Sequence, residues 1–175
     1  DRMDKAVAKL KHDLSGIRTG RANPGLVDSL KVEIYGSQTP MKQLANVGAP
    51  EAQQLVIRPY DPGTIKEIEK AIIASGLGFA PQNDGRIIRI NVPPLTTDTR
   101  KKLVGRIKEM TEEAKISIRN VRRDGNKAAD QGEKDKELTE DDNKKVQADI
   151  QELTKKYEGT VETMAKAREA EVMGD

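Results

Sequence analysis

Basic side chains recur at a seven-residue spacing, and they are the residues in this chain whose type and spacing could support binding chemistry. Lys101, Lys108, Lys115 and Arg122 occupy one column of the repeat. Residues seven apart lie on nearly the same face of a helix, so these four charges form a row along one side. Such a row could bind an anionic surface. It could equally be a solvated helix face.

A cluster of arginines overlaps the end of this row. Arg119, Arg122 and Arg123 fall within five residues, and only the adjacent Asp124 offsets them. Arginine forms planar forks to phosphate and stacks on bases, so the cluster favours nucleic acid. With one Phe and no Trp, the chain lacks stacking platforms for single-stranded RNA, and an RNA partner should be structured and recognised by backbone and shape. Pairing of the row with acids such as Glu112 is the alternative.

The residue sets that most enzymes need are missing. The chain has a single histidine, His12, and no cysteine, so the usual bases, nucleophiles, thiolate zinc sets and disulfides are excluded. Gly76-Leu77-Gly78 lacks the remaining glycine of a dinucleotide loop, and it follows a predicted helix rather than a strand. We therefore expect a protein that is not an enzyme and has no cofactor and no metal site.

Apolar periodicity predicts three helices, over residues 1–20, over 95–136, and from a capping-box-like start at 139–142 onward. Each helix has a heptad seam. In the first it is Met3, Val7, Leu10, Leu14 and Ile17, and in the second it is Arg100, Ile107, Ala114, Val121 and Ala128 with Leu103, Met110 and Ser117. In the third it is Val146, Ile150, Leu153, Tyr157, Val161, Met164 and Ala167. Three helices with matching seams predict a three-helix bundle.

Residues 22–94 have a different pattern, with alternating apolar residues and frequent Gly and Pro. Strands are predicted at 30–35, 38–41, 44–47, 54–58, 78–82 and 86–92, with a short helix over 61–76. This segment is a small, mostly β, α/β domain inserted between helices of the bundle, which comprises 1–21 and 95–175. Both crossings carry Gly or Pro and should form a hinge at 20–25 and 92–96, which includes Ala22, Asn23, Pro24, Gly25, Val92, Pro93, Pro94, Leu95 and Thr96.

Charge is distributed unevenly although the net charge is only +2. Residues 97–127 contain ten Lys or Arg against five Asp or Glu, whereas residues 137–175 contain six against eleven. A basic helix beside an acidic one suits pairing between the two, and it could also direct one face at an anionic partner. Arg18 and Arg21 close the first helix and could extend the same basic surface.

Three motifs in one order resemble the bacterial ribosome recycling factor family. They are Ile17-Arg18-Thr19-Gly20-Arg21-Ala22-Asn23-Pro24, Val92-Pro93-Pro94-Leu95-Thr96 and Arg119-Asn120-Val121-Arg122-Arg123-Asp124. The resemblance extends through essentially the whole chain, except that further helical turns are expected before Asp1. It implies an L-shaped α+β protein with two domains, in which the smaller domain is inserted at the elbow of a three-helix bundle.

The resemblance also implies a function. Members of this family bind the post-termination ribosome and, with elongation factor G and its GTP hydrolysis, split it into subunits. The bundle would bind large-subunit ribosomal RNA through Arg18, Arg21, Arg119, Arg122 and Arg123, together with Lys115 from the basic row. The smaller domain would swing on the hinge and meet elongation factor G. The protein would be a cytoplasmic monomer, with neither DNA nor a membrane as partner.

Two other classes of function remain open from the sequence. The first is a structured-RNA-binding module for ribosome assembly that lacks recycling activity. The second is a helical scaffold whose charged faces bind other proteins. Subunit splitting that depends on elongation factor G and GTP separates recycling from the first class, and nuclease treatment of a pull-down separates it from the second.

Overall fold

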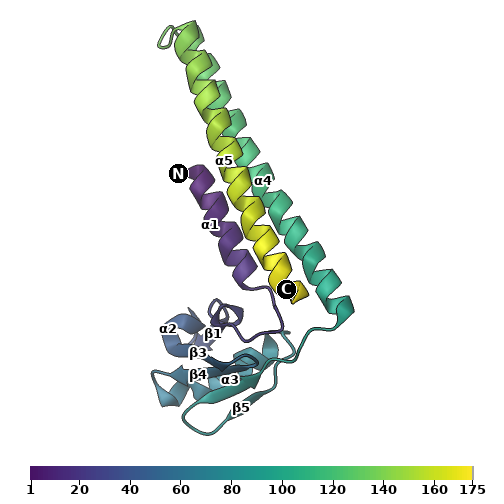
Figure 1. Cartoon of the computed structure of the whole chain (residues 1–175). Coiled ribbons are helices and arrows are strands. Elements are labelled where there is room, and N and C mark those ends of the chain that lie inside the picture. The colour runs from purple at the N-terminus through teal and green to yellow at the C-terminus, as the bar shows by residue number, and fades with distance from the viewer. Residues whose placement is uncertain (175) are drawn as a thin grey trace. The chain divides into compact units, whose positions relative to one another are not determined.

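The structure is a computed structural model that describes residues 1–174 (Figure 1). It divides into two compact units. The first consists of Asp1–Leu14 and Val104–Glu171, and the second of Ser15–Leu103 and Val172–Gly174. The first is helical, and the second holds a small antiparallel sheet, so the predicted α+β class with two domains is confirmed.

Three helices make up the first unit. They are α1 (Arg2–Ser15), α4 (Thr97–Lys134) and α5 (Glu140–Met173), and they lie side by side (Figure 1). The prediction that the first helix reaches residue 20 is wrong, since α1 ends at Ser15, directly before Gly16, a residue type that disfavours helix. Thr96 caps α4, because its Oγ1 accepts a hydrogen bond from the Thr99 amide at 3.2 Å.

Most buried positions of α4 and α5 repeat every eleven residues, while Ala114 of α4, also buried, fits the predicted heptad. The series are Ile107, Ile118 and Ala129 on α4, and Asn143, Thr154 and Ala165 with Val161 and Val172 on α5. An eleven-residue repeat corresponds to about 3.67 residues per turn, close to a straight helix, whereas a heptad seam requires left-handed supercoiling. The heptad prediction is therefore wrong at Ser117 and Ala128, which are exposed while the residue after each is buried.

The heptad prediction is also wrong at Val146 and Leu153, which are 36% and 46% exposed. Both residues lie closer to the α4–α5 turn than the positions that hydrogen-bond or ion-pair with α1. The first turn of α1 contacts the other two helices through Arg2, whose Nη2 lies 2.9 Å from Asp124, and through Asp4, which accepts a hydrogen bond from the Tyr157 hydroxyl. The part of α4 and α5 that lies further toward their connecting turn has no third helix against it within the described residues.

A polar network joins α4 and α5 in this two-helix part. The amide nitrogen of Asn143 donates a hydrogen bond to Asp130 at 3.1 Å and another to Glu133, although the side chain is almost fully buried. Gln147 donates to Asp130 at 2.7 Å and to the Asn143 side-chain oxygen at 2.8 Å. Buried polar groups need such partners, so the network fixes how the two helices pair where the apolar seam is thin.

Gly125 lies where α4 packs closely against Ile150 of α5. A Cβ at this position would lie 2.9 Å from Cδ1 of Ile150, whereas a Cβ at Gly105, on the same helix, would meet no atom within 4 Å. Helix propensity alone makes Gly to Ala favourable by about 0.5–1 kcal/mol. We expect Gly105→Ala to raise the free energy of unfolding by this amount in urea. Gly125→Ala should not show this gain, because the Ile150 side chain must move to make room. Equal gains in the two variants would contradict the close contact.

The start of α5 is held by a reciprocal cap. Thr139 Oγ1 accepts a hydrogen bond from the Asp142 amide at 3.1 Å, and the Asp142 carboxylate accepts one from the Thr139 hydroxyl at 2.7 Å. These hydrogen bonds from Thr139 lower the pKa of Asp142 below its ordinary value of 3.8. Since the folded-state pKa is depressed, the carboxylate contributes stability above the unfolded value and loses it as the pH falls through the folded value.

Asp142→Asn should therefore be less stable than the parent chain at neutral pH, and the gap should close as the pH falls below about 4. Thermal unfolding of both proteins between pH 3 and pH 7 measures this difference. Asp141→Asn is the matched control, because Asp141 is an exposed acid in the same turn whose side chain makes no hydrogen bond to Thr139. A gap that stays constant over this range would show that the Asp142 charge contributes nothing.

The second unit is built on a four-stranded antiparallel sheet with the strand order β3-β4-β6-β5. The strands are β3 (Ala45–Glu51), β4 (Gln54–Pro59), β5 (Pro81–Asn83) and β6 (Ile88–Asn91). A separate hairpin pairs β1 (Lys31–Ile34) with β2 (Ser37–Pro40). Two helices, α2 (Met41–Leu44) and α3 (Ile65–Ala74), complete the unit with the 3-10 turns η1 (Pro24–Leu26) and η2 (Pro62–Thr64).

One apolar core holds this unit together. Leu55, Ile57, Ile88 and Ile90 alternate along the central strands, are fully buried, and share a core cluster with Ile68 of α3. The strands predicted at 38–41 and 44–47 overlap the segment that forms the single turn α2. Periodicity could not identify this turn, because four residues are too few for a helical repeat.

Candidate nucleic-acid interface

Two of the predicted RNA-binding residues on α4 form ion pairs with α5. Lys115 Nζ lies 2.5 Å from Glu162, and Arg119 Nε lies 2.9 Å from Glu158, with Glu112 of α4 a further 3.2 Å partner of Arg119. Hydrogen bonding to Lys115 lowers the pKa of Glu162, and hydrogen bonding to Glu158 raises the pKa of Arg119. The expected pairing of the basic helix with the acidic one is confirmed at these positions.

The next two arginines on α4 are different. Arg122 Nη1 donates a hydrogen bond to the side-chain oxygen of Gln151 at 3.4 Å, so its partner is neutral. Arg123 is exposed, and within residues 1–174 neither arginine has a carboxylate within 4.0 Å. Asp124, the acid next to them in sequence, is paired with Arg2 of α1. Arg122 and Arg123 therefore retain positive charge that the protein itself does not neutralise.

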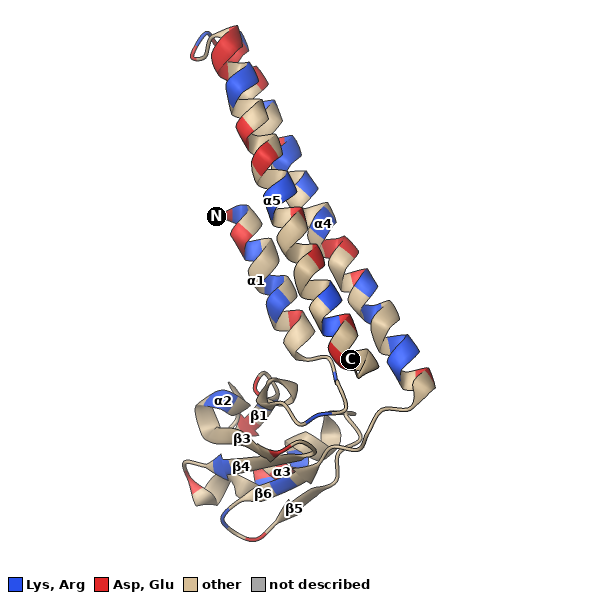
Figure 2. Cartoon of the chain, viewed as in Figure 1, with Lys and Arg blue, Asp and Glu red and all other residues tan. Residues whose placement is uncertain are grey.

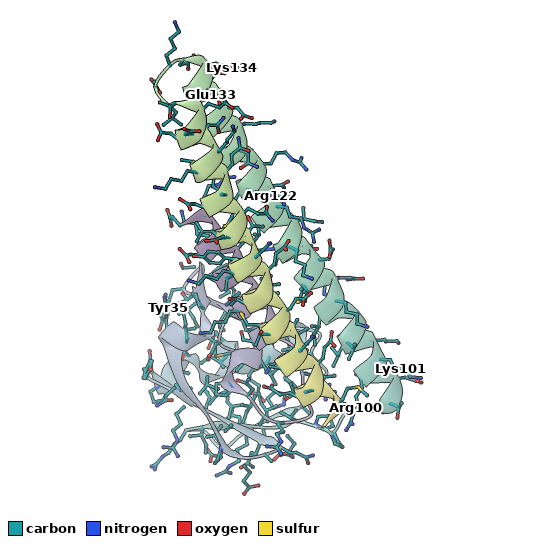
Figure 3. All side chains as sticks on the ribbon, turned by 45° about the horizontal axis from the view of Figure 1, so that its top comes forward. Tyr35, Arg100, Lys101, Arg122, Glu133 and Lys134 are labelled. Atoms are coloured by element: carbon teal, nitrogen blue, oxygen red, sulfur yellow. The ribbon has the colours of Figure 1, made fainter. Side chains whose placement is uncertain are left out.

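The basic row continues toward the beginning of α4. Lys101 and Lys108 are exposed, and Figure 2 shows Lys and Arg interspersed with Asp and Glu along α4 and α5. In Figure 3, Arg122 lies part-way along α4, between Lys101 near the beginning of the helix and Lys134 near its end. The unneutralised arginines thus lie in the middle of the long helix.

Arg18 and Arg21 belong to the second unit. Arg18 Nη2 donates a hydrogen bond to the Pro93 carbonyl at 2.8 Å, and its guanidinium lies 5.6 Å from the centre of the Phe79 ring. These contacts orient Arg18 within its own unit. Arg21 is exposed.

The segments predicted as a hinge contact each other and the sheet. The Ala22 amide donates to the Ala52 carbonyl at 2.6 Å, and the Val92 amide donates to the Gln53 carbonyl at 2.8 Å, so both segments attach to the β3–β4 turn. Asn23 caps η1 by accepting a hydrogen bond from the Gly25 amide at 2.9 Å. Of the remaining predicted hinge residues, Leu95 is buried, Pro24 is half-buried, and Pro93, Pro94 and Thr96 are exposed.

Within residues 1–174, no group of three or more His, Cys, Asp or Glu side chains is placed to hold a metal ion. No helix in the same range is both long and apolar enough to cross a membrane.

Comparison with known proteins identifies the family. The sequence profile of the family described as ribosome recycling factor matches residues 10–173, nearly the whole chain. The chain belongs to the ribosome recycling factor family. This confirms the resemblance found in the three motifs.

Individual relatives agree. A ribosome-recycling factor from Rhodopirellula baltica is 71% identical over 129 residues, which cover 74% of this chain and 69% of that protein. One from Halalkalibacterium halodurans is 48% identical over 172 residues, or 98% and 93% of the two chains. A chloroplastic ribosome-recycling factor from Oryza sativa subsp. indica is 44% identical and covers 99% of this chain and 65% of its own length.

Solved structures of ribosome recycling factors share the fold. A solution structure superposes with a TM-score of 0.77 at 39% identity and covers 99% of this chain and 92% of its own. The T. thermophilus ribosome recycling factor, described together with E. coli elongation factor G bound to the E. coli post-termination complex, gives a TM-score of 0.69 at 41% identity, covering 98% and 92%.

Proposed function

We propose that this chain binds the post-termination ribosome and, together with elongation factor G and GTP hydrolysis by that partner, splits it into subunits. The observation that carries the proposal is the match, over 98% of the chain, to a recycling factor described with elongation factor G on the post-termination complex. GTP hydrolysis belongs to the elongation factor, so the chain itself catalyses no reaction and needs no cofactor. It acts in the compartment where translation takes place, the cytoplasm in a bacterium.

The RNA contact of the first unit is assigned to α4. Arg122 and Arg123 are its strongest candidates because their charge is unneutralised, whereas Lys115 and Arg119 already have carboxylate partners. Phosphate contacts of this kind release counterions, so binding should weaken steeply as salt rises. Arg18 and Arg21, which follow α1 in the chain, are proposed as further RNA contacts.

The domain boundaries and the hinge are part of the same proposal. A bundle of residues 1–21 and 95–175 would stay on the ribosomal RNA, while residues 22–94 move on the segments 20–25 and 92–96. The glycine and proline content of these segments supports this assignment, as does the positive φ of Gly20, which is +78°. Such a hinge would transmit a push from the elongation factor to the bundle.

Light scattering of post-termination ribosomes tests the proposal. The chain, elongation factor G and GTP together should lower the scattering as subunits separate, and omission of any one should prevent the drop. A control with a recycling factor and elongation factor from one organism checks the ribosomes and the reagents. Tight binding to large subunits with no splitting, even with several elongation factors, would instead favour a ribosome-assembly module.

A further inference from the structure

Three basic residues of α4 each have one partner on α5, and the partners are not of the same kind. Lys115 and Arg119 bind the carboxylates of Glu162 and Glu158, whereas Arg122 binds an amide oxygen. The three contacts, called the ladder below, run in antiparallel order along the two helices, with steps of four and then three residues on α4 against four and then seven on α5. Arg122 makes the third of these contacts. At the third contact α5, which has more acidic than basic residues, presents the neutral Gln151.

The environment of Arg122 on its own helix is also free of acids. Side chains three and four residues away on a helix are its neighbours. For Arg122 these are Ile118, Arg119, Gly125 and Asn126. Arg119, the one charged neighbour, is basic and already holds two carboxylates. The ladder therefore leaves one guanidinium oriented but not neutralised.

We propose that Gln151 is a positioning residue for RNA binding, which holds the Arg122 guanidinium through a neutral hydrogen bond and so keeps its full charge available to a phosphate. This inference rests on the proposed function. The Gln151 oxygen accepts a hydrogen bond from Nη1, and the four other N–H groups of a guanidinium can then face an external anion. A phosphate fork needs at least two of them.

A carboxylate at the same position would act differently. It would pair with Arg122 as Glu158 pairs with Arg119, and its charge would compete with the phosphate for the same guanidinium. Glu162 and Glu158 thus offset the charges of Lys115 and Arg119, whereas Gln151 leaves the charge of Arg122 without an offset. The residues of α5 would therefore decide which basic side chain of α4 binds an anion most strongly.

Binding of the full chain to isolated large ribosomal subunits, measured over a range of salt concentrations, tests the proposal. Gln151→Glu should weaken binding about tenfold at low salt and reduce the salt slope by about one phosphate contact. Ala167→Glu is the matched control, because it adds the same charge at an exposed position sixteen residues further along α5. Glu158→Gln should have the opposite effect and strengthen binding, since it frees Arg119.

The outcomes separate the inference from the function on which it rests. If the parent chain binds and Gln151→Glu binds like Ala167→Glu, with the same salt slope and the same helicity, the proposed role of Gln151 is overturned. Loss of binding with an unchanged salt slope would also overturn it, because a structural defect does not remove one phosphate contact selectively. Failure of the parent chain itself to bind large subunits would overturn the proposed function.

Discussion

Arg122→Ala should weaken binding to large ribosomal subunits about 10- to 100-fold, because a hydrogen bond between a charged arginine and phosphate contributes about 1.5–3 kcal/mol. Arg122 has no carboxylate partner within residues 1–174, so little of this energy is offset by the loss of an internal ion pair. Subunit splitting at limiting protein concentration should fall by a similar factor. Binding titrations and light scattering measure the two effects.

The control for this prediction is Lys134→Ala. Lys134 is an exposed cation on the same helix, near its end and away from Arg122 (Figure 3). Its removal lowers the net charge by the same amount without touching the arginine cluster. Equal losses in the two variants would mean that binding depends on overall charge rather than on Arg122. Loss of helicity in Arg122→Ala would assign the effect to folding.

Leu10→Ala should lower the free energy of unfolding of the helical unit by about 2–5 kcal/mol, the usual cost of a cavity at a fully buried leucine. Leu10 is 2% exposed on α1, where it packs in the seam between the helices. Leu153→Ala is the matched control, because Leu153 is 46% exposed and should cost far less. Urea unfolding followed by circular dichroism measures both.

Hydrogen exchange on the same variant tests the division into two units. Amides of α1, α4 and α5 should lose protection in Leu10→Ala, while those of β4 and β6 should keep it, because that sheet has a separate core. Uniform loss of protection across both regions would show that the chain unfolds as one cooperative body.

The sequence was sufficient to predict most of the helices and strands but few of the individual contacts between them. A capping box acts locally, and the structure places Thr139 at the start of α5, as the sequence predicts. The buried seam of the long helices was harder to predict, because heptad and eleven-residue repeats agree over the first few turns and diverge later. Ile107 fits both patterns, whereas Ile118 fits only the longer one.

The charge balance of the candidate site depends on contacts between distant parts of the chain. Sequence suggested that Asp124 offsets the arginine cluster, but Arg2 pairs with this acid across 122 residues of chain. It could not distinguish Arg119 from Arg122 either, because their partners Glu158 and Gln151 are on α5. These partners can be assigned only once the register of α4 against α5 is known, and the sequence alone does not give that register.

The order of the helices along the chain has a consequence for synthesis on the ribosome. α1 leaves the exit tunnel first, yet Leu10 and Leu14 can be covered only by helices that begin at Thr97 and Glu140. The strands and α3, by contrast, are contiguous in the chain and can fold as soon as residue 92 has emerged. The second unit should therefore fold first during translation, and the nascent α1 should remain open to chaperones until α5 is complete.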